Sequence, residues 1–255
     1  MALFLVGTGL SEGDMTERAV EACISAGELF IDPYTSVVHP KTINRISKLA
    51  GKDPTALSRS DMEEKANVLV AKAKTKDIAI LVGGDPLIAT THKILFIEAR
   101  RQGVRFYPIH STSIFSVAIG ESGLDFYRFG KTFTIPKWSD HYKPVSFYET
   151  LKANMGINAH SVVLLDFDQQ TSTSMEISEA LQELEAAEEK YREGIITQDM
   201  KLFIMSNLCA EGEVKKYITL ADAKKTEFAK APALLIIPAK LKDIENEAVA
   251  SMFGD

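Results

Sequence analysis

A strand–helix–strand pattern between residues 78 and 109 constrains the fold more than any other feature of this sequence. A very apolar run at residues 78–83 precedes a helical pattern at about residues 90–102, which ends at Gly103, and a second apolar run covers residues 104–109. A helical crossover of this kind joins parallel strands of one sheet. We therefore expect the first half of the chain to be a compact α/β domain with a parallel sheet.

Further apolar runs of strand length cover residues 3–7, 29–32, 132–135, 161–165, 202–205, 217–220 and 233–238. In the second half these runs lie closer together and the helical patterns between them are less regular, which is typical of a mixed sheet. The chain has 255 residues, enough for two domains of ordinary size. We predict an N-terminal domain at residues 1–112 and a C-terminal domain at residues 113–255.

Two helices have clear sequence signals. Asp14 and Glu17 have the spacing of a capping box for the first helix, and Gly27 supplies a stop. The longest helix is expected at about residues 174–193. Its pattern predicts one apolar face that includes Leu184 and a solvated acidic face that includes Glu183.

Composition and charge exclude several classes of protein. The formal net charge is −6, which disfavours direct nucleic-acid binding, because such binding depends on basic charge that releases counterions. The apolar start is too short for a membrane span and has no basic region before it, so we interpret it as a strand and expect no membrane association. With only Cys23 and Cys209 present, we expect no disulfide and a cytoplasmic location. The five histidines are too scattered for a metal signature, so no metal is assigned.

The first candidate binding loop is Gly7-Thr8-Gly9-Leu10, directly after a strand. A dinucleotide-binding turn needs a third glycine at position 12, where this chain has Glu12, and an anionic side chain there would repel a diphosphate. A tight strand-to-helix turn is the alternative interpretation of the two glycines.

Two more candidate loops follow the two strands of the strand–helix–strand pattern. The first runs from Gly83 to His92 and contains Asp85, which could face a cation or a ribose hydroxyl; the alternative is a turn followed by a helix cap at Thr90 or Thr91. The second, residues 110–114, is either a polar binding loop or a plain helix N-cap. Ligands bind beyond the carboxyl ends of parallel strands, so we expect these loops to converge on one ligand site.

Several strings, in this order along the chain, resemble the diphthine synthase family of tetrapyrrole-methylase-like methyltransferases. They are Gly7-Thr8-Gly9-Leu10, Tyr34-Thr35-Ser36, Gly84-Asp85-Pro86 with Ala89-Thr90-Thr91-His92, His110 with Ser113-Ile114, and Tyr127-Arg128-Phe129-Gly130. The resemblance covers about residues 3–168 and resumes near residues 232–240. It implies a class III S-adenosylmethionine methyltransferase fold of two α/β domains, with the active-site cleft between them, and a homodimer.

The resemblance also implies S-adenosylmethionine contacts at Leu10, Asp85, Ile88, Ser113, Ile114, Leu165, Leu208 and Ala233. Two of these positions depart from the usual family pattern. Leu208 lies in Ser206-Asn207-Leu208-Cys209, where relatives have an A-R-A-G-like string, and Ala233 stands where many relatives have a histidine.

The activity implied by the resemblance is repeated methylation of a modified histidine on translation elongation factor 2, giving diphthine or its methyl ester. The cofactor would supply an activated methyl group, so the protein would mainly bind and orient, and the sequence identifies no catalytic base. The aromatic, basic stretch around Trp138 and the acidic second domain are candidates for docking the protein substrate. The alternatives are a tetrapyrrole or ribosomal RNA methyltransferase of the same fold, and a non-catalytic nucleotide-binding scaffold.

Overall fold

The computed structural model describes residues 1–33, 35–139, 141–168, 173–229 and 231–254. Within it the chain forms two compact units, Met1–Ile114 and Phe115–Asp255. The α/β architecture with two large sheets agrees with the expected fold class. None of the described helices is both long and apolar enough to cross a membrane.

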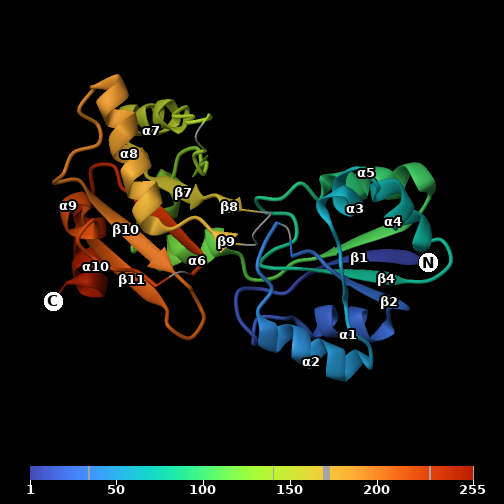
Figure 1. The fold of residues 1–255 in the computed structure, drawn as a ribbon. Coiled ribbons are helices and arrows are strands. Elements are labelled where there is room, and N and C mark those ends of the chain that lie inside the picture. Colours follow the sequence, from blue (N-terminus) through green and yellow to red (C-terminus); the bar gives the residue numbers. More distant parts are fainter. Residues whose placement is uncertain (34, 140, 169–172, 230, 255) are drawn as a thin grey trace. The chain divides into compact units, whose positions relative to one another are not determined.

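The first unit is built on a parallel sheet of strand order β3-β2-β4-β1-β5. Its strands are β1 (Ala2–Gly7), β2 (Glu28–Ile31), β3 (Thr55–Ala56), β4 (Ile78–Val82) and β5 (Arg105–Ile109), and its helices are α1 (Glu17–Ser25), α2 (Pro40–Ala50), α3 (Arg59–Glu63), α4 (Ala66–Lys72) and α5 (Lys93–Gln102). Helices α1 and α2 cover one face of the sheet and α3, α4 and α5 the other (Figure 1).

Alternation along the central strand explains this layering. Ile78 and Ile80 of β4 belong to the core under α4 and α5, whereas Ala79 and Leu81 belong to the core under α1 and α2. Successive side chains of a strand point to opposite faces, so a strand that is apolar throughout must be covered on both sides. The strand–helix–strand pattern at residues 78–109 therefore forms the parallel unit that the sequence predicts.

The second unit has a mixed sheet of strand order β11-β10-β12-β7-β6, in which only the β6–β7 pair is parallel. Its strands are β6 (Phe133–Ile135), β7 (Ser161–Leu165), β10 (Lys201–Ser206), β11 (Val214–Thr219) and β12 (Ala233–Ile237), with a separate small hairpin of β8 (Phe167–Asp168) and β9 (Thr173–Ser174). The helical segments are α6 (Ile114–Gly120), the short 3-10 helix Phe126–Arg128, α7 (Phe147–Gly156), α8 (Ile177–Tyr191), α9 (Leu220–Ala223) and α10 (Asp243–Phe253).

Two local predictions are wrong for identifiable reasons. Asp14 does not cap the first helix: Thr16 does, because its side chain accepts from the Ala19 N–H, and the Asp14 carboxylate binds the preceding turn instead. The predicted strand at residues 217–220 ends one residue early, since Thr219 caps helix α9 and Leu220 begins it.

Candidate functional site

The candidate site lies at the carboxyl edge of the first sheet, where three neighbouring strands end together. The register pairs Gly7 of β1 with Val82 of β4, and Val6 with Ile109 of β5. The loops that follow these strands, residues 8–14, 83–92 and 110–114, therefore start side by side. This is the edge at which open parallel sheets bind ligands.

The glycine turn after β1 joins the loop after β4 through paired backbone hydrogen bonds. The Gly9 N–H donates to the Gly84 carbonyl at 3.2 Å, and the Gly84 N–H donates to the Gly9 carbonyl at 2.9 Å. A Cβ on Gly7 would lie only 2.8 Å from the Gly84 oxygen. The glycines are thus needed for a close approach of two loops, which agrees with the tight-turn interpretation.

Asp14 stabilises the same turn from the other side. Its Oδ2 accepts hydrogen bonds from the backbone N–H groups of Leu10 and Ser11, each at 2.8 Å. Because these donors are occupied, they are not offered to a ligand. The side chain of Leu10 lies close to Gly84, because a Cβ added to that glycine would lie 3.9 Å from Leu10 Cδ2.

Asp85 links the loop after β4 to the loop after β5. Its Oδ2 lies 2.8 Å from His110 Nδ1 and 3.4 Å from the Ser111 N–H, and its Oδ1 accepts from the Leu87 N–H at 3.0 Å. The residue is buried, with 8% of its surface exposed. A carboxylate has about four acceptor positions, so three protein donors leave little capacity for a ligand. In the structure this carboxylate therefore holds the two loops together.

The structure brings five of the eight predicted cofactor contacts onto these three loops: Leu10, Asp85, Ile88, Ser113 and Ile114. Ser113 is buried, Leu10 and Ile114 are half-buried, and Ile88 exposes 46% of its surface. A single exposed apolar side chain is common on protein surfaces, so the exposure of Ile88 does not by itself identify a ligand site. The expected convergence of the loops at residues 7, 84 and 110 is confirmed.

The other three predicted contacts, Leu165, Leu208 and Ala233, lie at one edge of the second sheet. Leu165 ends β7, Ala233 begins β12 beside it, and Leu208 is buried two residues after β10. The segment after β10 is unusual because Asn207 and Cys209 both have left-handed backbones, with φ of 54° and 64°. Asparagine tolerates this region, but cysteine is strained in it.

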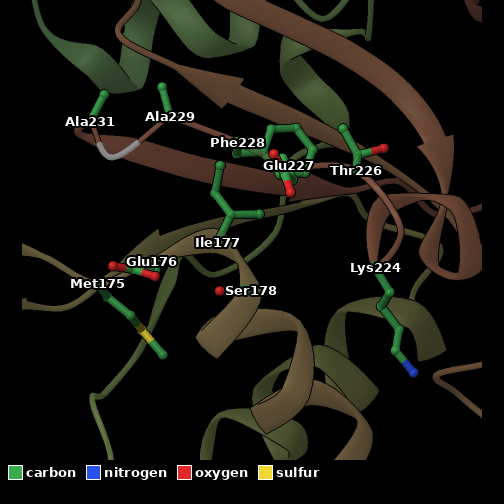
Figure 2. A pocket seen from close by; sticks show the side chains of 10 residues that line it. All are labelled: Met175, Glu176, Ile177, Ser178, Lys224, Thr226, Glu227, Phe228, Ala229 and Ala231. Atoms are coloured by element: carbon green, nitrogen blue, oxygen red, sulfur yellow. The ribbon is translucent and has the colours of Figure 1, made fainter.

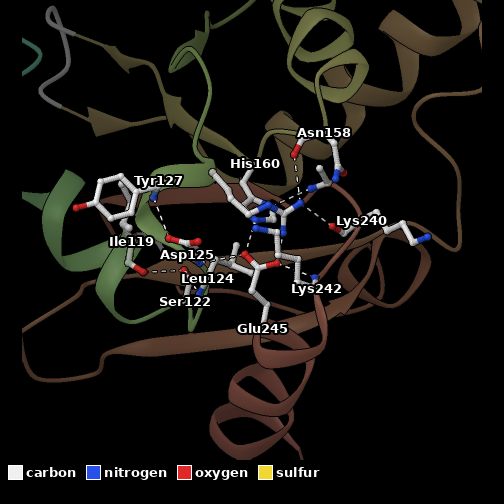
Figure 3. A network of polar contacts seen from close by, with 12 residues as sticks. Ile119, Ser122, Leu124, Asp125, Tyr127, Asn158, His160, Lys240, Lys242 and Glu245 are labelled. Atoms are coloured by element: carbon white, nitrogen blue, oxygen red, sulfur yellow. Dashed lines mark hydrogen bonds and ion pairs between the residues drawn. The ribbon is translucent and has the colours of Figure 1, made fainter.

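Two strings of the family resemblance have structural roles that sequence reasoning missed. Thr35 and Ser36 contact the loop after β4, while Tyr34 of the same string lies outside the described residues. Arg128 of the Tyr127-Arg128-Phe129-Gly130 string enters a buried polar network with Glu245 and His160. Glu245 and His160 are labelled in Figure 3. Only the polar or charged type of these residues hinted at the contacts, since each partner lies far away in the sequence.

The network in Figure 3 defines the protonation state of its members. The Ala239 N–H donates to His160 Nδ1 at 3.0 Å, so Nε2 carries the proton and donates to Glu245 Oε1 at 2.9 Å. Burial lowers the pKa of His160 and outweighs the carboxylate beside it. Burial alone would raise the pKa of Glu245, but backbone N–H groups of Lys242 and Asp125, together with His160, lower it to about 2. Arg128 completes the network as an ion pair with Glu245.

A cavity of about 380 Å³ lies within the second unit, between the start of α8 and residues 224–229 and 231 (Figure 2). Its lining is mixed: Ile177 and Phe228 contribute apolar surface, and Glu176, Glu227 and Lys224 contribute charge. None of the eight predicted cofactor contacts lines this cavity. The residues that line this cavity are therefore different from those of the three converging loops.

Comparisons with known proteins agree with this geometry. A family model described as tetrapyrrole (corrin/porphyrin) methylases matches residues 2–223. The chain is 32% identical to a diphthine synthase of Methanothermobacter thermautotrophicus, with 99% of this chain and 96% of that protein covered, and 34% identical to one of Methanosphaera stadtmanae, with 98% and 95% covered. A crystal structure of a diphthine synthase superimposes with a TM-score of 0.87 at 31% identity, covering 99% of this chain and 96% of that one.

Proposed function

Because the chain belongs to the diphthine synthase family, within the tetrapyrrole methylases, and is a methyltransferase, we propose that it methylates translation elongation factor 2 during diphthamide biosynthesis. In this proposal S-adenosylmethionine is the methyl donor. The acceptor is one modified histidine side chain, which receives several methyl groups in successive rounds.

The observation that carries the donor site is the convergence of the loops after β1, β4 and β5. Hydrogen bonds between Gly9 and Gly84 and between Asp85 and His110 fix all three loops to one another. A preorganised edge of this kind binds a ligand without the entropic cost of ordering the loops first. The half-exposed Ile88 and the half-buried Leu10 and Ile114 fit a cofactor with an apolar adenine face.

S-adenosylmethionine, when bound, supplies a methyl group that its sulfonium already activates. The chain therefore has to bind, orient and exclude water rather than provide a nucleophile. We assign apolar contact with the cofactor to Leu10, Ile88 and Ile114, and assign to Asp85 the positioning of the loops that carry them. For transfer, the attacking amine must lie in line with the methyl carbon and the sulfur, which is a matter of orientation.

The proposal extends to the second unit and to the setting of the reaction. Ser113 is assigned a polar contact with the cofactor, and Leu165, Leu208 and Ala233 are assigned further contacts from their edge of the second sheet. We further propose that the protein acts in the cytoplasm as a homodimer. Direct binding to nucleic acid is disfavoured by the net charge of −6.

Incubation with labelled S-adenosylmethionine tests the function against its alternatives. Three acceptors are offered: elongation factor 2 carrying the unmethylated intermediate, ribosomal RNA and a porphyrinoid. We expect label on the elongation factor alone, with mass spectrometry giving the number of methyl groups. Label only on RNA or on the porphyrinoid, or cofactor binding without transfer to any acceptor, contradicts the proposal.

Calorimetry tests the site itself. We expect Asp85→Arg to abolish S-adenosylmethionine binding, because the substitution removes the acceptor that holds His110 and Ser111 and inserts a cation next to a cationic sulfur. Glu21→Arg, on the exposed side of α1, is the control for the same change of charge. Unchanged affinity in Asp85→Arg would remove Asp85 from the site.

A further inference from the structure

The loops after β2 and β4 are joined around a buried histidine that the proposed function does not use. We propose that His92 and Asp32 form a positioning clamp, which holds the segment from Asp85 to Ile88 in the conformation that binds S-adenosylmethionine. This inference rests on the proposed function and adds two positioning residues to it. Neither residue touches the cofactor in the proposal, because both are almost completely buried, at 1% and 0% exposure.

The geometry around the His92 ring shows what each ring nitrogen contacts. Nδ1 lies 2.9 Å from the Pro86 carbonyl oxygen, and Nε2 lies 2.8 Å from Asp32 Oδ2. The carbonyl can only accept, so Nδ1 carries a proton. Asp32 also accepts from the Thr35 N–H, at 3.3 Å, and from the Thr35 hydroxyl, so its carboxyl group is bound to the loop after β2 as well as to His92. The clamp is therefore a buried histidine–carboxyl pair with hydrogen bonds to both loops.

A second contact joins the same two loops. The Gly83 N–H donates to Ser36 Oγ at 2.9 Å, and a Cβ on Gly83 would lie 2.3 Å from the Val37 carbonyl oxygen. The loop after β2 is thus in direct backbone contact with the loop after β4. The Thr35-Ser36 pair and His92, which lie more than fifty residues apart in the sequence, belong to one assembly.

The clamp acts where the loop is strained. Ala89 has φ of 54°, a left-handed conformation that is strained for a residue with a side chain. Such strain persists only where the surroundings enforce it, and it concentrates at functional sites. Ala89 lies between Ile88 and the clamp, and the clamp fixes both Pro86 and His92, one on each side of it. Without the hydrogen bond to Pro86, the segment can relax and carry Asp85 and Ile88 away from their observed positions.

Two variants of His92 separate positioning from stability. Gln at this position can place its amide nitrogen near Nε2 and keep the contact with Asp32, but it loses the bond to Pro86. Asn can place its amide nitrogen near Nδ1 and keep the bond to Pro86, but it leaves Asp32 without the histidine. We expect His92→Gln to weaken S-adenosylmethionine binding about tenfold or more in calorimetry, and His92→Asn to be less affected in binding but to melt at a lower temperature.

The chain offers a matched control in its other buried histidine–carboxylate pair. His160→Gln removes the Nδ1 acceptor next to Glu245 in the second unit, and we expect a lower melting temperature with unchanged cofactor affinity. Ser36→Ala is a milder change to the same pair of loops, which loses only the acceptor for the Gly83 N–H. It should weaken cofactor binding severalfold even if His92→Gln fails to fold.

The outcomes distinguish the clamp from the proposed function. If the unaltered protein does not bind S-adenosylmethionine, the proposed function fails, and the clamp fails with it. If the unaltered protein binds the cofactor and both His92→Gln and Ser36→Ala bind it equally well, only the clamp is overturned. The clamp is also overturned if the cofactor affinity falls in His160→Gln as much as in His92→Gln, because the lower affinity would then follow from lower stability alone. A raised KM for the cofactor with an unchanged KM for the elongation factor supports the clamp.

Discussion

Glu183 Oε1 accepts a hydrogen bond from the Trp138 N–H at 3.1 Å, while Oε2 of the same carboxylate is buried and has no hydrogen-bond partner among the described residues. The prediction that Glu183 belongs to a solvated face of α8 is therefore wrong, since the residue exposes only 4% of its surface. Lys137 and Trp138 contact this part of the helix, and a sequence pattern cannot reveal contacts with residues more than forty positions away. Burial raises the pKa of Glu183 to about 7, and Glu179 and Asp166 act in the same direction.

Replacing Glu183 by Gln should stabilise the protein in mildly alkaline solution. A carboxyl whose pKa is raised by folding stays protonated to a higher pH in the folded state than in the unfolded state. Its burial therefore does not reduce the free energy of unfolding below about pH 4.5, and the reduction is complete above about pH 7. We expect Glu183→Gln to raise the free energy of unfolding by about 1 kcal/mol at pH 8, with little gain at pH 5. Urea denaturation at both pH values measures this, with exposed Glu189→Gln as the control. An equal gain at both pH values would contradict it.

The elements of the fold could be predicted from local patterns, but the partners of polar side chains could not. Strands β4, β5 and β7 are evident because an apolar run bounded by turn residues is a property of a few neighbouring residues. The two-residue strands β3, β8 and β9 carry no such pattern and were missed. Helix α5 begins at Lys93 rather than near Thr90, and His92, which contacts Asp32, is its N-cap residue.

The candidate site was predictable to the extent that topology determines it. Parallel strands end at one edge, so the loops at residues 7, 84 and 110 had to converge. The hydrogen-bond partners within the loops were not predictable. Asp85 binds His110 and Asp14 binds the glycine turn, and such contacts cannot be read from a local sequence pattern. The same is true of Arg128, whose partner Glu245 lies 117 residues further along the chain.

The Glu245 network should make the second unit sensitive to acid. The folded-state pKa of Glu245 is lowered to about 2. The contribution of this carboxylate to the free energy of unfolding is therefore complete above about pH 4.5 and is lost as the pH falls toward 2. The lowered pKa of His160 acts in the same direction. Glu245→Gln leaves Arg128 buried without its carboxylate and should cost about 3 kcal/mol at pH 7. The difference between the two proteins in urea denaturation should narrow as the pH falls from 7 to 3.5, and a constant difference would contradict the assignment.

Cys209→Gly should stabilise the segment after β10. Cys209 has φ of 64°, which a residue without a Cβ adopts at little cost, so we expect a gain of about 1 kcal/mol in the free energy of unfolding. Asn207→Gly is the matched control, because Asn207 has a similar φ of 54° but belongs to a residue type that tolerates it and donates to the Glu211 carbonyl. Chemical denaturation should show a gain for Cys209→Gly alone. A lower free energy of unfolding in Cys209→Gly would show that the cysteine side chain stabilises the protein by more than the backbone strain destabilises it.

Gly7→Ala should disrupt the convergence of the three loops. The added Cβ would lie 2.8 Å from both the Gly84 oxygen and Pro86 Cδ, so β1 and the loop after β4 must move apart. We expect a loss of about 1 to 3 kcal/mol in the free energy of unfolding and a loss of S-adenosylmethionine binding in calorimetry. Gly13→Ala, in the same connection between β1 and α1, meets no atom within 4 Å and should leave both quantities unchanged. If Gly7→Ala lost stability but bound the cofactor as tightly as Gly13→Ala, the close approach of Gly7 to the loop after β4 would serve folding and not the cofactor site.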